Sequence, residues 1–292
     1  MQPIPPAAFK SLEPRKLVDR WIRRGRFLGL RHLSPATPLD PQRTAQPILV
    51  AALGGSGTRA IVELLVESGI FMGDWVDPST GDSLFLRHFL HAHFDALVQD
   101  PEREDSAVRR EFDRAIRAHR NGIPNEGDDW GWKNPRSLWL LPWFVQSFPG
   151  LRFIHLVRDG RDLALSQNNF LLDDHGRSVL GDRYTGDPVR DQFELWAMGN
   201  LRAADASARL LGPRALLIRY EDLCADPMRE IGRLHAFLGR PLPREAALRI
   251  AASVKPSPTL GRGLLDSSET LRACSVRHAE ALHRFGYATP AC

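Results

Sequence analysis

The chain has few cysteines and no long apolar run. Its three cysteines, Cys224, Cys274 and Cys292, are widely spaced and odd in number. This pattern argues against a disulfide framework or a zinc cluster and favours a reducing compartment, so we expect a cytoplasmic protein. No stretch approaches the roughly 18 consecutive apolar residues of a transmembrane helix, and no secretory apolar core is apparent.

Most of the sequence has no excess of positive charge. The net charge is +4, but residues 1–46 hold nine Lys and Arg against three Asp and Glu, which leaves residues 47–292 slightly acidic. We therefore expect a basic amino-terminal segment before one large domain, and no nucleic-acid partner. Residues 16–31 predict a short basic amphipathic helix that packs on the domain or, alternatively, contacts a membrane surface weakly.

A glycine-rich loop follows the first apolar run. Residues 48–53 predict a strand, residues 54–58 read Gly-Gly-Ser-Gly-Thr, and an amphipathic helix follows. This arrangement directs backbone N–H groups and a positive helix end at one point, as anion sites require. A tight turn without a ligand is the alternative. The Walker pattern fails, because Ala52 and Thr58 stand where it has glycine and lysine, so the loop predicts phosphate binding without that lysine.

Further strands are predicted at residues 69–73, 130–133, 151–157 and 215–220, and helical patterns alternate with them. Alternation of this kind predicts a single α/β domain with a mainly parallel sheet flanked by helices. Ligands of such sheets collect at the carboxyl ends of the strands. Lys133 ends one predicted strand, which directs it toward the same crevice as the loop. A surface lysine is the alternative.

Residues after the most strongly predicted strand, residues 151–157, could hold a second anion. Arg158 follows that strand, and Ser166 lies eight residues later, on the helix predicted to follow. A planar guanidinium suits a phosphate, and this spacing allows a hydroxyl on the helix to flank the same group.

Two helical regions carry less specific signals. Asp82 begins a helical pattern, where capping alone would explain an aspartate. His88, His91 and His93 follow, but without a third ligand at metal spacing, so we predict no metal site. Residues 101–121 are strongly charged and predict a solvated surface helix.

Together these motifs resemble the sulfotransferases that use 3′-phosphoadenosine 5′-phosphosulfate (PAPS), whose fold is similar to that of P-loop NTPases. The resemblance covers roughly residues 47–287. It implies that the glycine loop holds the 5′-phosphosulfate, the arginine and serine hold the 3′-phosphate, and the segment Tyr220–Pro227 brings its tyrosine near the adenine. Residues 255–263 resemble a loop that closes over the nucleotide. The implied nucleotide-binding residues are Gly55, Ser56, Gly57, Thr58, Arg59, Arg158, Ser166, Tyr220, Lys255, Gly261 and Arg262.

The sequence departs from the family pattern at two points. Many members have Lys or Arg where Gly55 stands, so Arg59 or Lys133 must supply the cation. The general base is a histidine in some members and a glutamate soon after the second strand in others. Asp82 lies where that glutamate would fall, which makes it the candidate base, with Asp77 and His88 next in order.

The resemblance implies metal-independent, in-line transfer of a sulfuryl group from PAPS to a hydroxyl or amine, with release of 3′-phosphoadenosine 5′-phosphate (PAP). Small molecules, sugars and lipids all remain open as acceptors. One alternative is a small-molecule kinase on the same fold, which the missing Walker lysine disfavours. Another is a nucleotide-binding protein without turnover.

Overall fold

The computed structural model describes residues 46–123, 128–240 and 243–288. The predicted helix at residues 16–31 lies outside the described residues, as does almost all of the basic segment 1–46. Cys224 and Cys274 are free thiols, and Cys292 also falls outside the described part of the chain.

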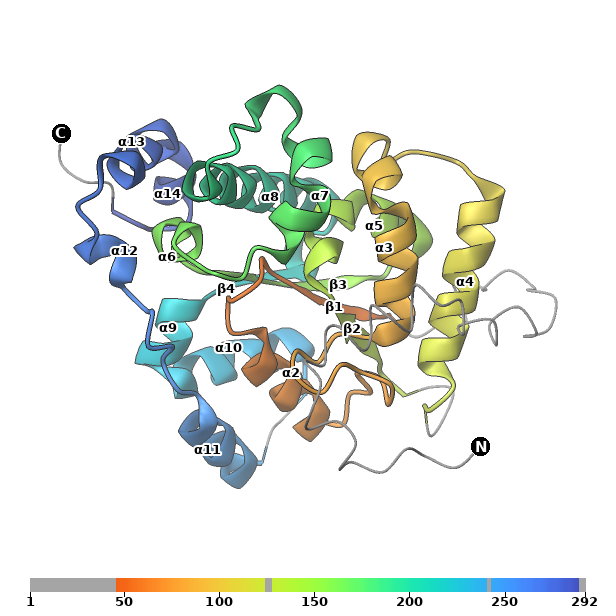
Figure 1. Ribbon diagram of the computed structural model, residues 1–292. Coiled ribbons are helices and arrows are strands. Elements are labelled where there is room, and N and C mark those ends of the chain that lie inside the picture. The colour runs from red at the N-terminus through yellow and green to blue at the C-terminus, as the bar shows by residue number, and fades with distance from the viewer. Residues whose placement is uncertain (1–45, 124–127, 241–242, 289–292) are drawn as a thin grey trace, which may run out of the picture.

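A parallel sheet forms the centre of the molecule, which confirms the predicted α/β class (Figure 1). Val50 pairs with Lys133 on one side and with Ile154 on the other. This register brings the carboxyl ends of the three strands to one edge of the sheet. The strand order is β2-β1-β3-β4, and the strands are β1 (Ile48–Ala51), β2 (Gly131–Lys133), β3 (Arg152–Val157) and β4 (Ala215–Arg219).

The prediction of a strand at residues 69–73 was wrong. Only Phe71 makes a bridge there, to Trp130, in parallel orientation. Gly69 and Gly73 flank it with φ angles of 77° and 100°, in the left-handed region. Extended backbone is therefore interrupted at both ends of the segment, and a single bridge is all that it can form.

Helices cover both faces of the sheet, and two apolar clusters fill the space between (Figure 1). Leu49 and Ala51 face one cluster while Ile48 and Val50 face the other, as the alternation of a strand requires. The first cluster involves α3 (Leu84–Gln99), α4 (Ser106–Arg120), α5 (Leu141–Ser147), α7 (Phe170–Leu180) and α8 (Pro188–Leu210). The second involves α2 (Thr58–Glu67), α10 (Pro227–Leu238) and α11 (Arg244–Ser253).

Helix α4 lies at the surface, as predicted, but it is not solvated on all sides. Val108, Phe112 and Ile116 are buried against the first cluster, and His119 lies on the same face. No helix in the described ranges has the length and apolar character that a membrane crossing needs. The remaining elements are the short helices α6 (Gly160–Ala164), α9 (Tyr220–Ala225), α12 (Arg262–Leu265), α13 (Glu269–Arg277) and α14 (Ala279–Arg284), with 3₁₀ turns at Pro135–Leu140, Gly181–Arg183 and Gly212–Arg214.

Candidate functional site

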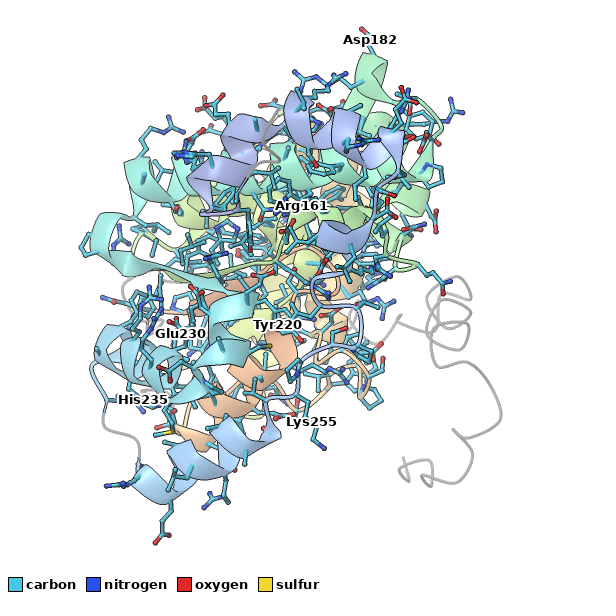
Figure 2. All side chains as sticks on the ribbon, turned by 90° about the vertical axis from the view of Figure 1, so that its left-hand side faces the viewer. Arg161, Asp182, Tyr220, Glu230, His235 and Lys255 are labelled. Carbon is cyan, nitrogen blue, oxygen red and sulfur yellow. The ribbon has the colours of Figure 1, made fainter. Side chains whose placement is uncertain are left out.

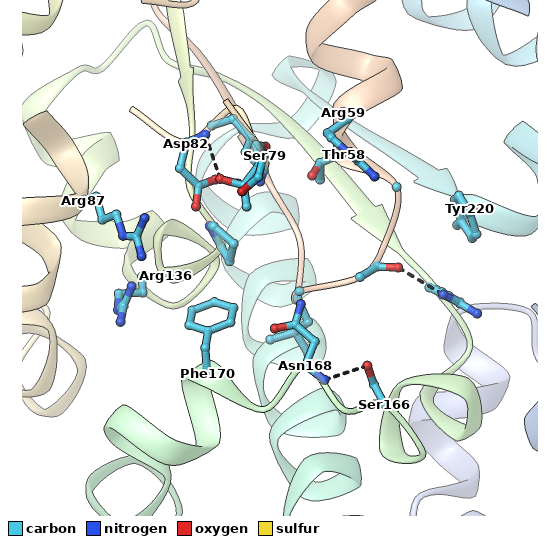
Figure 3. A pocket seen from close by; sticks show the side chains of 18 of the residues that line it. Thr58, Arg59, Ser79, Asp82, Arg87, Arg136, Ser166, Asn168, Phe170 and Tyr220 are labelled. Atoms are coloured by element: carbon cyan, nitrogen blue, oxygen red, sulfur yellow. Dashed lines mark hydrogen bonds and ion pairs between the residues drawn. The ribbon is translucent and has the colours of Figure 1, made fainter. Parts of the chain in front are cut away.

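A pocket of about 560 Å³ opens at the carboxyl edge of the sheet (Figure 3). It runs from the glycine loop and Tyr220 at one end to two arginines, Arg87 and Arg136, at the other. Of the predicted site residues, it brings together Gly55, Gly57, Thr58, Arg59, Asp82, Lys133, Arg158, Ser166 and Tyr220.

The glycine loop presents an uncapped helix end to this pocket. Gly55 and Gly57 have φ angles of 91° and 78°, and Gly57 is the N-cap of α2 without any side-chain capping bond. The first N–H groups of α2 therefore have no intrahelical partner and remain available to an anion. A Cβ at Gly57 would lie 2.3 Å from the Tyr220 ring, so only glycine fits there.

Two polar residues of the loop have different surroundings. Ser56 is buried, and its Oγ donates to the carbonyl of Leu53 at 2.8 Å, which holds the loop in shape. Arg59 is exposed and lines the pocket from α2, and it has no ion-pair partner among the described residues. The loop therefore offers backbone donors inside the pocket and one cationic side chain at its margin.

Arg158 is held in place by several bonds beside the loop. Its guanidinium donates to Asp162 at 2.8 Å, to the carbonyl of Gly55 at 3.1 Å and to Thr259 Oγ1 at 3.1 Å. It also lies 5.2 Å from the centre of the Tyr220 ring. Arg158 is only 4% exposed, so an anion that reaches it meets a fixed, largely desolvated cation.

Ser166 does not lie on a helix, contrary to prediction. Helix α6 ends at Ala164, and Ser166 follows it in the loop that leads to α7. The cause is local, because the Ser166 Oγ accepts from the N–H of Asn168 at 3.1 Å and so stabilises a turn. Ser166 and Arg158 nevertheless line the same pocket, as their spacing suggested.

Backbone N–H groups of residues 255–263 form hydrogen bonds near the end of the pocket that contains Tyr220. The Tyr220 hydroxyl accepts from the N–H of Ser257 at 2.9 Å, and burial raises the pKa of Tyr220, which keeps its hydroxyl protonated. Further along, Gly261 N–H donates to the buried Asp162 carboxylate at 2.8 Å, and Arg262 donates to the Asp162 carbonyl at 2.8 Å.

Three predicted residues of this segment do not line the pocket. Lys255 is exposed and lies at the periphery in Figure 2, while Gly261 and Arg262 contact Asp162. Ser257 and Thr259 line the pocket instead. Two residues of this segment thus line the pocket, but they are not the residues that the motif named.

Lys133 and Asp82 form a buried ion pair in the wall of the pocket. Lys133 Nζ lies 2.6 Å from Asp82 Oδ1, and the two side chains are 6% and 11% exposed. Lys133 also donates to the carbonyl of Thr80 at 3.0 Å. A proton acceptor and a cationic donor thus lie side by side, facing the space between the two ends of the pocket.

Asp82 is not the cap of its helix, so capping no longer explains it. Ser83 is the N-cap of α3, and its Oγ accepts from the N–H of Leu86 at 3.4 Å. The two reserve candidates for the base do not line the pocket. Asp77 is buried in an ion pair with Arg87 at 2.9 Å, and His88, on α3, does not belong to the lining residues.

His119, which the sequence analysis did not single out, connects the two chain segments that carry Asp82 and Lys133. Ser83 donates to His119 Nδ1 at 3.0 Å, and His119 Nε2 donates to the carbonyl of Gly131 at 2.8 Å. Ser83 follows Asp82 and Gly131 begins the strand that ends at Lys133, so His119 fixes their separation. Burial lowers the pKa of His119, consistent with the neutral ring that these bonds require. Its place on the apolar face of α4 was the available signal.

Three potential metal ligands, His91, Asp174 and His175, offer atoms within 4.8 Å of one another. Both ring nitrogens of His175 are already engaged, because Nε2 accepts from Arg136 at 3.1 Å and Nδ1 bonds to Asp95 at 2.9 Å. His175 and Asp174 therefore belong to a hydrogen-bonded network around Arg136.

Comparison with known proteins gives the family. A family model described as the sulfotransferase family matches residues 47–244, more than half of the chain. The chain belongs to the sulfotransferase family. Carbohydrate sulfotransferase 1 of Rattus norvegicus is 30% identical over 118 residues, which cover 38% of this chain and 29% of that protein. Carbohydrate sulfotransferase 5 of Mus musculus is 34% identical over 110 residues, 34% of this chain and 28% of that protein. The matches thus span less than a third of these curated relatives.

Solved sulfotransferase structures share the fold. A sulfotransferase from Mycobacterium avium superimposes with a TM-score of 0.54 at 15% identity, covering 94% of this chain and 83% of that one. The sulfotransferase domain of the Synechococcus PCC 7002 olefin synthase gives the same TM-score and identity, covering 85% and 97%. The sulfotransferase fold is therefore preserved at low sequence identity.

Proposed function

We propose that this sulfotransferase transfers a sulfuryl group from PAPS to a hydroxyl acceptor. The observation that carries the proposal is one pocket that joins an uncapped glycine loop and Arg158 to the Asp82–Lys133 ion pair. Anion-binding groups at one end and a proton acceptor beside a cation in the middle are what such a transfer needs.

The residues present fit the nucleotide. The loop amides and the start of α2 would hold the 5′-phosphosulfate, because no side chain caps these N–H groups. Arg158 and Ser166 would hold the 3′-phosphate through a guanidinium and a hydroxyl. Tyr220, against both the loop and Arg158, offers an aromatic face to the adenine.

The proposed chemistry assigns different tasks to the members of the ion pair. Asp82 accepts the proton of the attacking hydroxyl as the new S–O bond forms, and the bridging S–O bond breaks to release PAP. Lys133 donates to the sulfuryl or bridging oxygens, the charge that Gly55 cannot provide. A base placed in this way contributes about 10²–10⁴-fold. Since Lys133 supplies that positive charge, we propose that the transfer requires no metal ion.

We propose a sugar hydroxyl as the acceptor. The support is the sequence similarity to carbohydrate sulfotransferases, together with the polar side chains at the far end of the pocket. We also propose a reducing, cytoplasmic location, because Cys224 and Cys274 are unpaired.

A transfer assay tests this function. The protein is incubated with ³⁵S-labelled PAPS and a panel of sugars, with and without EDTA, and PAP release is followed in parallel. Labelled sugar together with equimolar PAP, insensitive to EDTA, is the expected result. Transfer of phosphate from γ-labelled ATP with Mg²⁺, and none from PAPS, would instead favour the kinase.

A further inference from the structure

The end of the pocket farthest from Tyr220 is built from side chains that the proposed chemistry leaves without a role. Figure 3 shows Arg87 and Arg136 at this end of the pocket, and the Phe170 ring in view between Arg136 and the loop that carries Ser166 and Asn168. These residues come from α3, the turn after β2, and α7, and α3 contacts both of the other elements. Lining residues at this end also include His91, Asp173 and Asp174.

Arg136 is fixed from behind by the buried His175, which in turn bonds to Asp95. Its Nε donates to His175 Nε2 at 3.1 Å, and His175 Nδ1 donates to Asp95 at 2.9 Å. Because Nε2 accepts, the hydrogen of the neutral ring lies on Nδ1. Arg136 is only 4% exposed, so its guanidinium is immobilised in one orientation. Such preorganisation reduces the entropic cost of binding a ligand.

Asp174 completes a donor–acceptor pair at the pocket surface. Its Oδ2 accepts from Arg136 Nη2 at 2.6 Å, while its side chain remains 41% exposed. A sugar hydroxyl both donates and accepts. Adjacent hydroxyls on a ring can therefore bond to the carboxylate and the guanidinium together.

The cations at this end are matched by carboxylates. Arg87 pairs with Asp77 at 2.9 Å, Arg136 pairs with Asp174, and Asp173 contributes a further negative charge. This end therefore has no excess of positive charge to attract an anion, and the Asp174 carboxylate repels one directly. At the opposite end, the loop amides and Arg59 provide positive charge that attracts an anion.

Phe170 connects the two ends. Its ring lies 5.3 Å from the Arg136 guanidinium, and a Cβ at Gly54 would approach its edge to 3.0 Å. Phe170 thus borders both the glycine loop and the Arg136–Asp174 pair. It offers an apolar surface to a ring whose hydroxyl faces the transferred group.

We infer that the Arg136–Asp174 pair, fixed by His175, selects an uncharged sugar ring over an acidic one at the acceptor position. The inference rests on the proposed function and adds to it the charge of the acceptor and the residues that read it. An acidic sugar would place its carboxylate against Asp174 and compete with it for Arg136.

The test measures the binding of two sugars that differ in one group, methyl β-D-glucopyranoside and methyl β-D-glucuronide, to the PAP-loaded full chain by saturation-transfer NMR titration. The variants are Asp174→Asn, Arg136→Lys and the matched control Asp182→Asn, whose side chain points into solvent far from the pocket in Figure 2. The wild type is expected to prefer the glucoside by about tenfold, the effect of about 1.4 kcal/mol. Asp174→Asn should abolish or invert that preference, Arg136→Lys should weaken both sugars, and Asp182→Asn should change neither.

Three results would overturn the inference: a wild type that prefers the glucuronide, an Asp174→Asn variant with an unchanged ratio, or no binding of either sugar at millimolar concentration. If PAP does not bind, the same titration without PAP still measures the preference between the two sugars. Failure of PAP to stabilise the protein would count against the proposed function, whereas PAP binding without sugar selection would overturn this inference alone.

Discussion

The two ends of the pocket are built in different ways. The end near Tyr220 combines backbone N–H groups of the glycine loop and of the start of α2 with the side chains of Arg158 and Tyr220, each of which follows a strand. The far end relies on side chains of α3, α7 and the turn after β2, which are distant in sequence. Backbone N–H groups are suited to phosphates, which every such nucleotide carries. Side chains, in contrast, can change without altering the fold. The end near Tyr220 therefore suits a donor nucleotide, which is always the same, and the far end suits an acceptor, which can differ.

The Asp82–Lys133 pair lies between these ends. A substitution there should change turnover without changing nucleotide affinity. The largest effect is expected for Asp82→Asn, which removes the proton acceptor and keeps the shape of the side chain. Turnover should fall by about 10²–10⁴-fold while the Kd of PAP stays unchanged. Because Ser83, not Asp82, caps α3, the helix should remain intact. Steady-state kinetics and calorimetry with PAP measure both quantities, and retained turnover would remove Asp82 from the mechanism.

A change at the nucleotide end should have the opposite pattern. By the proposed role of Arg158, Arg158→Ala should remove charge-assisted bonds to the 3′-phosphate, each of which contributes about 1.5–3 kcal/mol. The preference for PAP over 5′-AMP should therefore drop by ten- to a hundredfold, with 5′-AMP affinity little changed. Titration of both nucleotides gives the ratio. Arg110→Ala, an exposed arginine on α4, is the control, and an unchanged ratio in Arg158→Ala would separate this residue from the 3′-phosphate.

A smaller effect is expected at His119, which touches no ligand and positions the ion pair. His119→Ala should lower kcat by about tenfold, the equivalent of about 1.4 kcal/mol, and leave PAP affinity unchanged. His119→Gln can still donate to the Gly131 carbonyl and accept from Ser83, so it should recover much of kcat. A general loss of stability would instead lower both variants alike, without recovery in the glutamine variant.

The smallest predicted effect concerns pH. Burial lowers the pKa of His119 below its ordinary value of 6.5. The unfolded chain therefore binds a proton that the folded chain refuses, so the stability due to the neutral ring is present above pH 6.5 and is lost as pH falls toward the lower folded pKa. In urea unfolding between pH 7 and pH 5, the wild type should lose more stability than His119→Gln. Equal slopes would show that another group controls the acid response.

The same contrast explains how much could be predicted from sequence. The glycine loop, Arg158 and Tyr220 sit next to strands, so local pattern and spacing were enough to bring them together. Ser166 was assigned to a helix because a turn stabilised by its own hydroxyl leaves no periodic signal. His119, His175 and Asp174 were missed because their roles depend on which helices pack side by side, and a single sequence does not show that. Asp82 and Lys133 were each proposed, but their 2.6 Å contact is visible only in the fold.

The central claim is that this pocket is made for a 3′-phosphorylated nucleotide, and thermal denaturation with PAP or with ATP and Mg²⁺ tests it most directly. At a hundredfold excess over Kd, a ligand that binds only the folded state stabilises it by about 2.7 kcal/mol. We expect a clear rise in the melting temperature with PAP and a much smaller one with ATP and Mg²⁺. Equal or greater stabilisation by ATP and Mg²⁺ would contradict it.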